Sequence, residues 1–142
     1  MKSFFESFFS DAPLKPLALA TVRRGSRPPS YLAADPDQTK AKTNAAAVRL
    51  HVEPETVRAA IQDIALYDLE AAERSHGGNL LFICRSPMLR LPDGLHVWID
   101  CVDKQSRVAL FSRSRYAGHV DFGVNAQRVK YVIQELKKRC SS

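Results

Sequence analysis

One segment, residues 112–128, gathers most of the side chains that could do chemistry. It links the last expected strand to the last expected helix, and arginines beside a helix N-terminus bind carboxylate or phosphate groups. Serine, histidine and aspartate together are also the residue types of a hydrolase triad. The polar and glycine positions of the segment are Ser112, Arg113, Ser114, Arg115, Gly118, His119, Asp121, Gly123, Asn125 and Arg128.

The residue types of this segment favour a structural role. The two glycines permit a tight strand-to-helix turn, Asp121 can accept amide hydrogen bonds at the helix N-terminus, and Asn125 can tie the loop backbone. Arg128 follows Asp121 by about two helical turns, so its guanidinium can return to that carboxylate or reach Asp100. The positions interpreted as structural are Ser112, Ser114, Gly118, Asp121, Gly123 and Asn125.

The first functional alternative is an anion-binding site built from arginines. Arg113, Arg115 and Arg128 lie close to a helix N-terminus, where carboxylate or phosphate groups bind readily. His96 and Trp98, on the neighbouring expected strand, complete the candidate ligand-binding set.

The second functional alternative is a hydrolase in which Ser112 or Ser114 acts with His119 and Asp121. The sequence contains no G-x-S-x-G elbow, and both serines are expected to face the core. No catalytic residue is therefore assigned, and the sequence favours a non-enzymatic protein while leaving activity open.

The elements that must position these residues are read from hydrophobic spacing. A strand is expected over 46–52, and a helix begins at Pro54 and Glu55 and ends near Tyr67. Further strands are expected over 69–74, 80–85, 96–102 and 108–115, followed by a helix over 123–138.

The order β-α-β-β-β-β-α predicts an α+β fold, a curved antiparallel meander of four to five strands with two helices. By analogy it is helix-grip-like, which favours a cleft between the sheet and the C-terminal helix for an apolar or amphipathic ligand.

Alternation along the last two strands separates two faces of the expected sheet. The core face holds Val97, Ile99, Cys101, Val108, Leu110, Ser112 and Ser114. The opposite face, the preferred binding surface, holds His96, Trp98, Asp100, Phe111, Arg113 and Arg115. Trp98 and Phe111 are expected to pair across the strands.

Turn chemistry sets the expected register of the hairpin before these strands. The residues from Leu91 to Leu95 are typical of a three-residue hairpin loop with a left-handed glycine. That loop pairs Cys84 with Val102 and Arg85 with Cys101, so the two thiols point to opposite faces. A two-residue loop would instead set Cys84 opposite Cys101.

Residues 1–46 contain five prolines and are interpreted as an arm lying over a single domain of residues 47–139. Phe4, Phe5, Phe8 and Phe9 would line one side of a short helix. These rings either dock on the domain or attach to a membrane surface or a partner groove.

The motifs resemble a known family over roughly residues 20–138. S-R-S-R, then G-x-x-D-x-G-x-N with an arginine three residues later, is similar to the C-terminal signature of the bacterial and plastid family called domain of unknown function 1499. Supporting matches are R-x-P-D at 90–93, Ser106-Arg107-Val108, and Tyr31-Leu32-Ala33 after Arg23-Arg24. The resemblance implies a domain boundary but no reaction, and it places His119 and Tyr116 at variable positions.

Composition narrows the class of protein. The chain has 142 residues, 45% of them hydrophobic, and its formal net charge of +6 favours acidic partners. We expect a soluble, cytoplasmic protein, because no secretory or membrane-spanning run is present. Peripheral attachment to a membrane surface is compatible with this expectation. The spacing of the cysteines and histidines predicts reduced thiols and no metal site, and no cofactor motif is present.

The preferred hypothesis is a non-enzymatic binding or accessory protein for an amphipathic or anionic ligand or a protein partner. A nucleic-acid-binding module using the basic aromatic sheet face is the second hypothesis, and the Ser114/His119/Asp121 hydrolase is the third.

Overall fold

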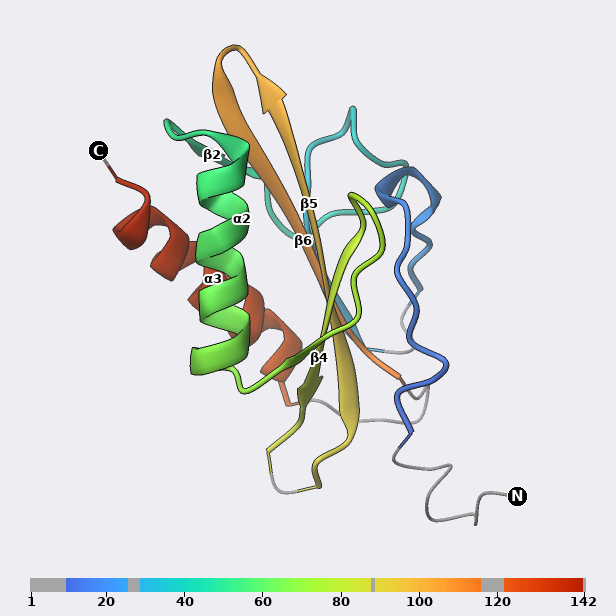
Figure 1. Cartoon of the computed structure of the whole chain (residues 1–142). Coiled ribbons are helices and arrows are strands. Elements are labelled where there is room, and N and C mark those ends of the chain that lie inside the picture. Colours follow the sequence, from blue (N-terminus) through green and yellow to red (C-terminus); the bar gives the residue numbers. More distant parts are fainter. Residues whose placement is uncertain (1–9, 26–28, 88, 116–121, 142) are drawn as a thin grey trace.

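The computed structural model describes residues 10–25, 29–87, 89–115 and 122–141. Its described part is an open antiparallel sheet of six strands with two helices on one face, which confirms the predicted α+β fold (Figure 1). The elements are η1 (Leu19–Thr21), β1 (Ser30–Ala33), β2 (Val48–Leu50), α2 (Pro54–Asp63), η2 (Ile64–Asp68), β3 (Ala72–Glu73), β4 (Leu80–Arg85), β5 (Pro92–Val102), β6 (Gln105–Ser114) and α3 (Val124–Arg139).

The sheet has the order β1-β6-β5-β4-β3, and β2 also pairs with β6. Thus two short strands follow one another along one edge of β6, at Ser30–Ala33 and Val48–Leu50. β1 was not predicted, because four residues beside a proline-rich stretch are too short to show strand alternation. Part of the segment interpreted as an arm is therefore a strand of the sheet, and the domain boundary at residue 46 remains a prediction.

Both helices begin and end close to their predicted bounds. Pro54 occupies the first turn of α2, which continues into a π-helical turn ending at Asp68. Gly123 precedes α3 in a left-handed conformation with φ of 81°, a backbone geometry that glycine adopts without strain. The buried apolar side chains of both helices follow the helical spacing from which the helices were predicted, so that spacing was a reliable signal.

The β5–β6 hairpin closes with a tighter turn than its sequence suggested. Asp103 and Lys104 have φ of 51° and 63°, and Val102 pairs directly with Gln105. Ala109, not Phe111, consequently lies opposite Trp98. The pairing moves by an even number of residues, so every side chain remains on its predicted face.

The predicted register of the β4–β5 hairpin is wrong. The reversal lies in 86–91, where Ser86 Oγ accepts the Leu91 amide at 3.0 Å. The predicted turn glycine, Gly94, is inside β5, where an added Cβ would lie 3.2 Å from His96 Nε2 and 3.3 Å from a Leu14 methyl. Close approach, rather than a turn, explains this glycine.

The register error also changes the positions of the thiols. Cys84 pairs with Asp93, not Val102, while Cys101 pairs with Ser106 near the other end of β5. Strand alternation places both thiols on the helix-covered face, so the prediction of opposite faces is wrong. The three cysteines are free.

The principal core fills the space between the sheet and the helices. Val97 and Leu110 are fully buried there against Val129, Val132 and Leu136 of α3. Core side chains therefore occupy the place where the sequence suggested a ligand cleft. On the opposite face, residues 10–25 and 34–44 form a covering layer (Figure 1). Its apolar side chains pack on Trp98 and Phe111.

Candidate functional site

A buried hydrogen-bond network joins the end of β6 to the first turns of α3. Asn125 Oδ1 accepts from Ser112 Oγ at 2.7 Å, and its amide nitrogen donates to Ser114 Oγ at 3.0 Å. Arg128 donates to Ser112 Oγ at 3.0 Å and forms an ion pair of 3.0 Å with Asp93. All five side chains are buried. This network satisfies polar groups that would otherwise be costly inside the protein.

Arg128 has a carboxylate partner that was not predicted. In the described part of the chain, the carboxylate that pairs with Arg128 is that of Asp93, from the R-x-P-D motif. Asp100 instead pairs with Arg107 at 2.6 Å. The prediction of an Arg128–Asp100 contact is wrong because these side chains point to opposite faces of the sheet. The proposed contact with Asp121 lies outside the described residues, as do Gly118 and His119.

The network also places the predicted serines. Ser112 and Ser114 are fully buried on the helix-covered face, as the alternation predicted. Their hydroxyl groups are bound within the network, while the other two members of the hydrolase hypothesis, His119 and Asp121, lie outside the described residues.

His96 and Arg113 lie on the other face of the sheet. Arg113 Nε donates to His96 Nε2 at 3.1 Å, which leaves the proton of a neutral ring on Nδ1. That Nδ1 is buried and has no hydrogen-bond partner among the described residues. Burial, followed by the charge of Arg113, lowers the pKa of His96 to about 3, so the ring is neutral at pH 7.

The predicted ligand-binding set is therefore divided between two faces. His96 stacks on Trp98 with ring centroids 5.9 Å apart and contacts Arg113, but Arg128 belongs to the network on the helix side. Arg115 directly follows β6. The covering layer buries Trp98, whose Nε1 donates to the Leu17 carbonyl at 2.7 Å. The aromatic face is thus an interior surface rather than an open platform.

An ion cluster fastens the covering layer to the sheet. Arg107 of β6 is buried and makes a bidentate contact with Asp100, at 2.6 and 2.9 Å. Its Nη1 also lies 2.8 Å from Asp37 and 3.4 Å from Asp35. Arg107 therefore holds the 34–44 segment in place.

The same segment forms one wall of a basic groove. The groove contains about 860 Å³ of space open to solvent. Residues 20–24 form one wall and residues 40–42 the other, and they contribute four cations, Arg23, Arg24, Lys40 and Lys42, and no acidic side chain. Arg24 donates to the Lys42 carbonyl and, at 3.0 Å, to Ser30 Oγ, so it ties the two walls together.

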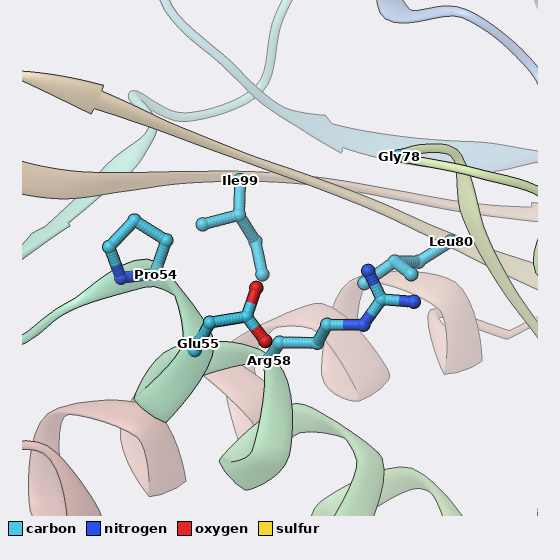
Figure 2. A pocket seen from close by; sticks show the side chains of 6 residues that line it. All are labelled: Pro54, Glu55, Arg58, Gly78, Leu80 and Ile99. Atoms are coloured by element: carbon cyan, nitrogen blue, oxygen red, sulfur yellow. The ribbon is translucent and has the colours of Figure 1, made fainter.

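A smaller pocket of about 330 Å³ lies between the start of α2 and the sheet (Figure 2). Glu55 and Arg58 extend from the helix toward Ile99 and Leu80. The two opposite charges share one small space, so this pocket has no net preference for an anion. No group of three metal-binding side chains occurs within the described residues.

These observations define an α+β protein whose last strand and last helix are joined by a buried polar network. The chain belongs to the family described as "Protein of unknown function (DUF1499)", whose model matches residues 21–136. No curated protein matches the sequence. The described part contains no helix that is both long and apolar enough to cross a membrane.

The motif residues that carried the resemblance, Ser112, Ser114, Asn125, Arg128 and the final Asp93 of R-x-P-D, are the members of the buried network. Sequence reasoning missed Asp93 as the partner of Arg128, although its motif was visible. It also missed Lys40 and Lys42, because nothing local indicates that they lie across a groove from Arg23.

Proposed function

We propose that this protein is a non-enzymatic binding protein for an anionic ligand, held in the basic groove between residues 20–24 and 40–42. The observation that carries the proposal is the presence of cations on both walls, with no acidic side chain among the described residues that line the groove. Such an arrangement attracts anions and offers charge-assisted hydrogen bonds to phosphate or carboxylate oxygens.

The groove is also preorganised. Three donors of Arg24 are used by the carbonyls of Lys42 and Ser30 and by the Ser30 hydroxyl, so Arg24 fixes the walls. Arg23, Lys40 and Lys42 are exposed and supply the donors for a ligand. A groove with fixed walls binds with a smaller loss of conformational entropy.

The lining supports binding rather than catalysis. Its described residues include no carboxylate, histidine or cysteine, and the one hydroxyl among them, on Thr21, donates to the Ala18 carbonyl at 2.7 Å. General acid–base chemistry needs titratable groups at the substrate, and nucleophilic chemistry needs an activated nucleophile.

Calorimetric titration with inorganic phosphate and with decyl phosphate tests the proposal. Lys40→Glu together with Lys42→Glu should weaken binding by about tenfold or more, because each charge-assisted hydrogen bond contributes about 1.5–3 kcal/mol. The matched control is Lys137→Glu with Lys138→Glu, the same charge change on exposed residues of α3. Binding that survives the groove variant but is lost in the control would contradict the proposal and indicate the pocket beside Lys137.

A further inference from the structure

One end of the sheet brings the β4–β5 loop close to the residues that enter α3. Arg85 at the end of β4 pairs with Pro92, and Asp93 pairs with Ser114 at the end of β6, so these strand ends are level. The Asn125–Ser114 hydrogen bond of 3.0 Å anchors the start of α3 at the same level. The β4–β5 loop and the residues that enter α3 therefore emerge from one end of the molecule, the lower end in Figure 1.

The β4–β5 loop and the entry to α3 each expose a large apolar side chain at this end. Leu89 in the β4–β5 loop is 68% exposed, and Phe122 before α3 is 88% exposed. Phe122 has φ of 50°, a left-handed conformation that glycine or asparagine adopts at lower cost. Its ring gains almost no burial within the described structure, so neither packing nor backbone preference explains a phenylalanine here.

The charged side chains that the structure describes around Leu89 and Phe122 are basic. We call residues 85–87, 89–92, 113–115 and 122–124 the arginine end. These residues include Arg85, Arg90, Arg113 and Arg115, although the Arg113 side chain is directed to His96 on the covered face. Of the two acids next to these residues in sequence, Asp93 is fully buried against Arg128, and Asp121 lies outside the described residues. Arg90, exposed in the same loop as Leu89, is the cation nearest in sequence to an apolar tip.

We propose that the arginine end is a docking surface for an anionic phospholipid bilayer, into which Leu89 and Phe122 insert. Peripheral attachment combines an apolar wedge with basic side chains near the headgroups, and this end of the molecule has both. Charge complementarity favours the anionic lipid surface as the occupant. The surface shares no residue with the basic groove, so the two proposals can be tested with separate variants and can fail independently.

Co-sedimentation with protein-free vesicles tests the docking surface. The wild-type protein should bind vesicles of phosphatidylcholine mixed with phosphatidylglycerol and not vesicles of phosphatidylcholine alone. Leu89→Asn with Phe122→Asn should weaken binding by about tenfold or more, because the apolar wedge is lost. Asparagine tolerates the backbone of Phe122, so the fold should be retained. Arg90→Glu, which leaves both apolar tips in place, should also weaken binding.

The matched control is Leu66→Asn with Tyr67→Asn, which removes two exposed large side chains from η2 and should leave vesicle binding unchanged. Lys40→Glu with Lys42→Glu should also leave it unchanged. Loss of vesicle binding in the groove variant, with retention in the Leu89/Phe122 variant, would overturn the docking surface and place the bilayer at the groove.

Insertion has its own optical test. The chain has a single tryptophan, Trp98, so Trp98→Phe provides a background without indole fluorescence. In that background, Phe122→Trp should shift its emission to shorter wavelength on anionic vesicles and become quenched by brominated lipid chains. Tyr67→Trp in the same background should do neither. An unchanged Phe122→Trp spectrum would overturn insertion, and binding only to membranes that retain their proteins would replace the lipid with a protein partner.

Discussion

At the scale of single residues, the buried ion pair between Asp93 and Arg128 matters most for the position of α3 on the sheet. Both side chains are buried, and Arg128 also donates hydrogen bonds to Ser112 and Asn125. A buried charge that loses its partner is strongly destabilising, whereas an intact buried pair contributes little net stability. The signature residues at these positions therefore specify how α3 sits on the sheet.

We expect Asp93→Ala and Arg128→Ala each to destabilise the protein by about 3–5 kcal/mol, since each leaves an uncompensated buried charge or acceptor. The double variant should lose less than the sum, because both changes remove the same ion pair. Urea unfolding of the four proteins at pH 7 measures the coupling. Additive penalties would show that the pair is not an energetic unit.

His96 predicts how stability depends on pH. Burial, then the charge of Arg113, holds its pKa at about 3 in the folded protein, against 6.5 for the unperturbed group. As the pH falls from about 6.5 toward 3, the unfolded chain takes up a proton that the folded protein refuses, so stability falls by up to about 1.4 kcal/mol per pH unit.

His96→Phe should remove this contribution and flatten the stability curve below pH 6.5. The measurement is urea unfolding across that range, with His76→Gln, an exposed histidine, as the control that should keep the wild-type slope. Parallel curves for the wild type and His96→Phe would contradict the buried neutral ring.

At the scale of elements, the β5–β6 turn is a site where stability can be gained. Both central residues adopt left-handed backbone conformations, and such turns prefer Asn-Gly. Lys104→Gly should therefore raise stability by about 0.5–1 kcal/mol, through relief of strain. Thermal unfolding measures the change, and Lys138→Gly in the last turn of α3 should instead lower the melting temperature. A lower melting temperature for Lys104→Gly would contradict the assigned turn.

At the scale of the whole molecule, the sheet is covered on both faces by different means. Helices α2 and α3 cover one face, and the N-terminal segment and residues 34–44 cover the other (Figure 1). The family match begins at residue 21, yet Leu14 and Leu17 before it contact the sheet. The described part of the segment before the match therefore belongs to the folded structure.

Deletion of residues 1–20 should lower the melting temperature and shift the emission of Trp98 to longer wavelength, because its Nε1 loses the Leu17 carbonyl and the ring gains water. Lys15→Ala, an exposed change in the same segment, should alter neither. An unchanged emission spectrum after the deletion would mean that this layer does not shield the tryptophan.

Local sequence patterns were sufficient to predict the main helices and strands. The apolar spacing in 57–65 and 129–136 predicted α2 and α3, and the bounds predicted for β4 are those observed. Alternation also assigned the faces of β5 and β6, and it survived an error in turn length because that error was even. These features depend on residues within a few positions of one another.

The pairing between segments that are distant in sequence could be identified only from the tertiary structure. Pro92-Asp93-Gly94 has the residue types of a turn, yet it lies within β5 because Asp93 meets Arg128 and Gly94 makes room for Leu14. The groove likewise joins Arg23 to Lys40 and Lys42 across the 34–44 segment, which Arg107 fastens to the sheet. The sequence by itself determined helices, strands and faces, because backbone geometry repeats every few residues. Register, ionic partners and the groove were decided only when remote side chains competed for the same buried space.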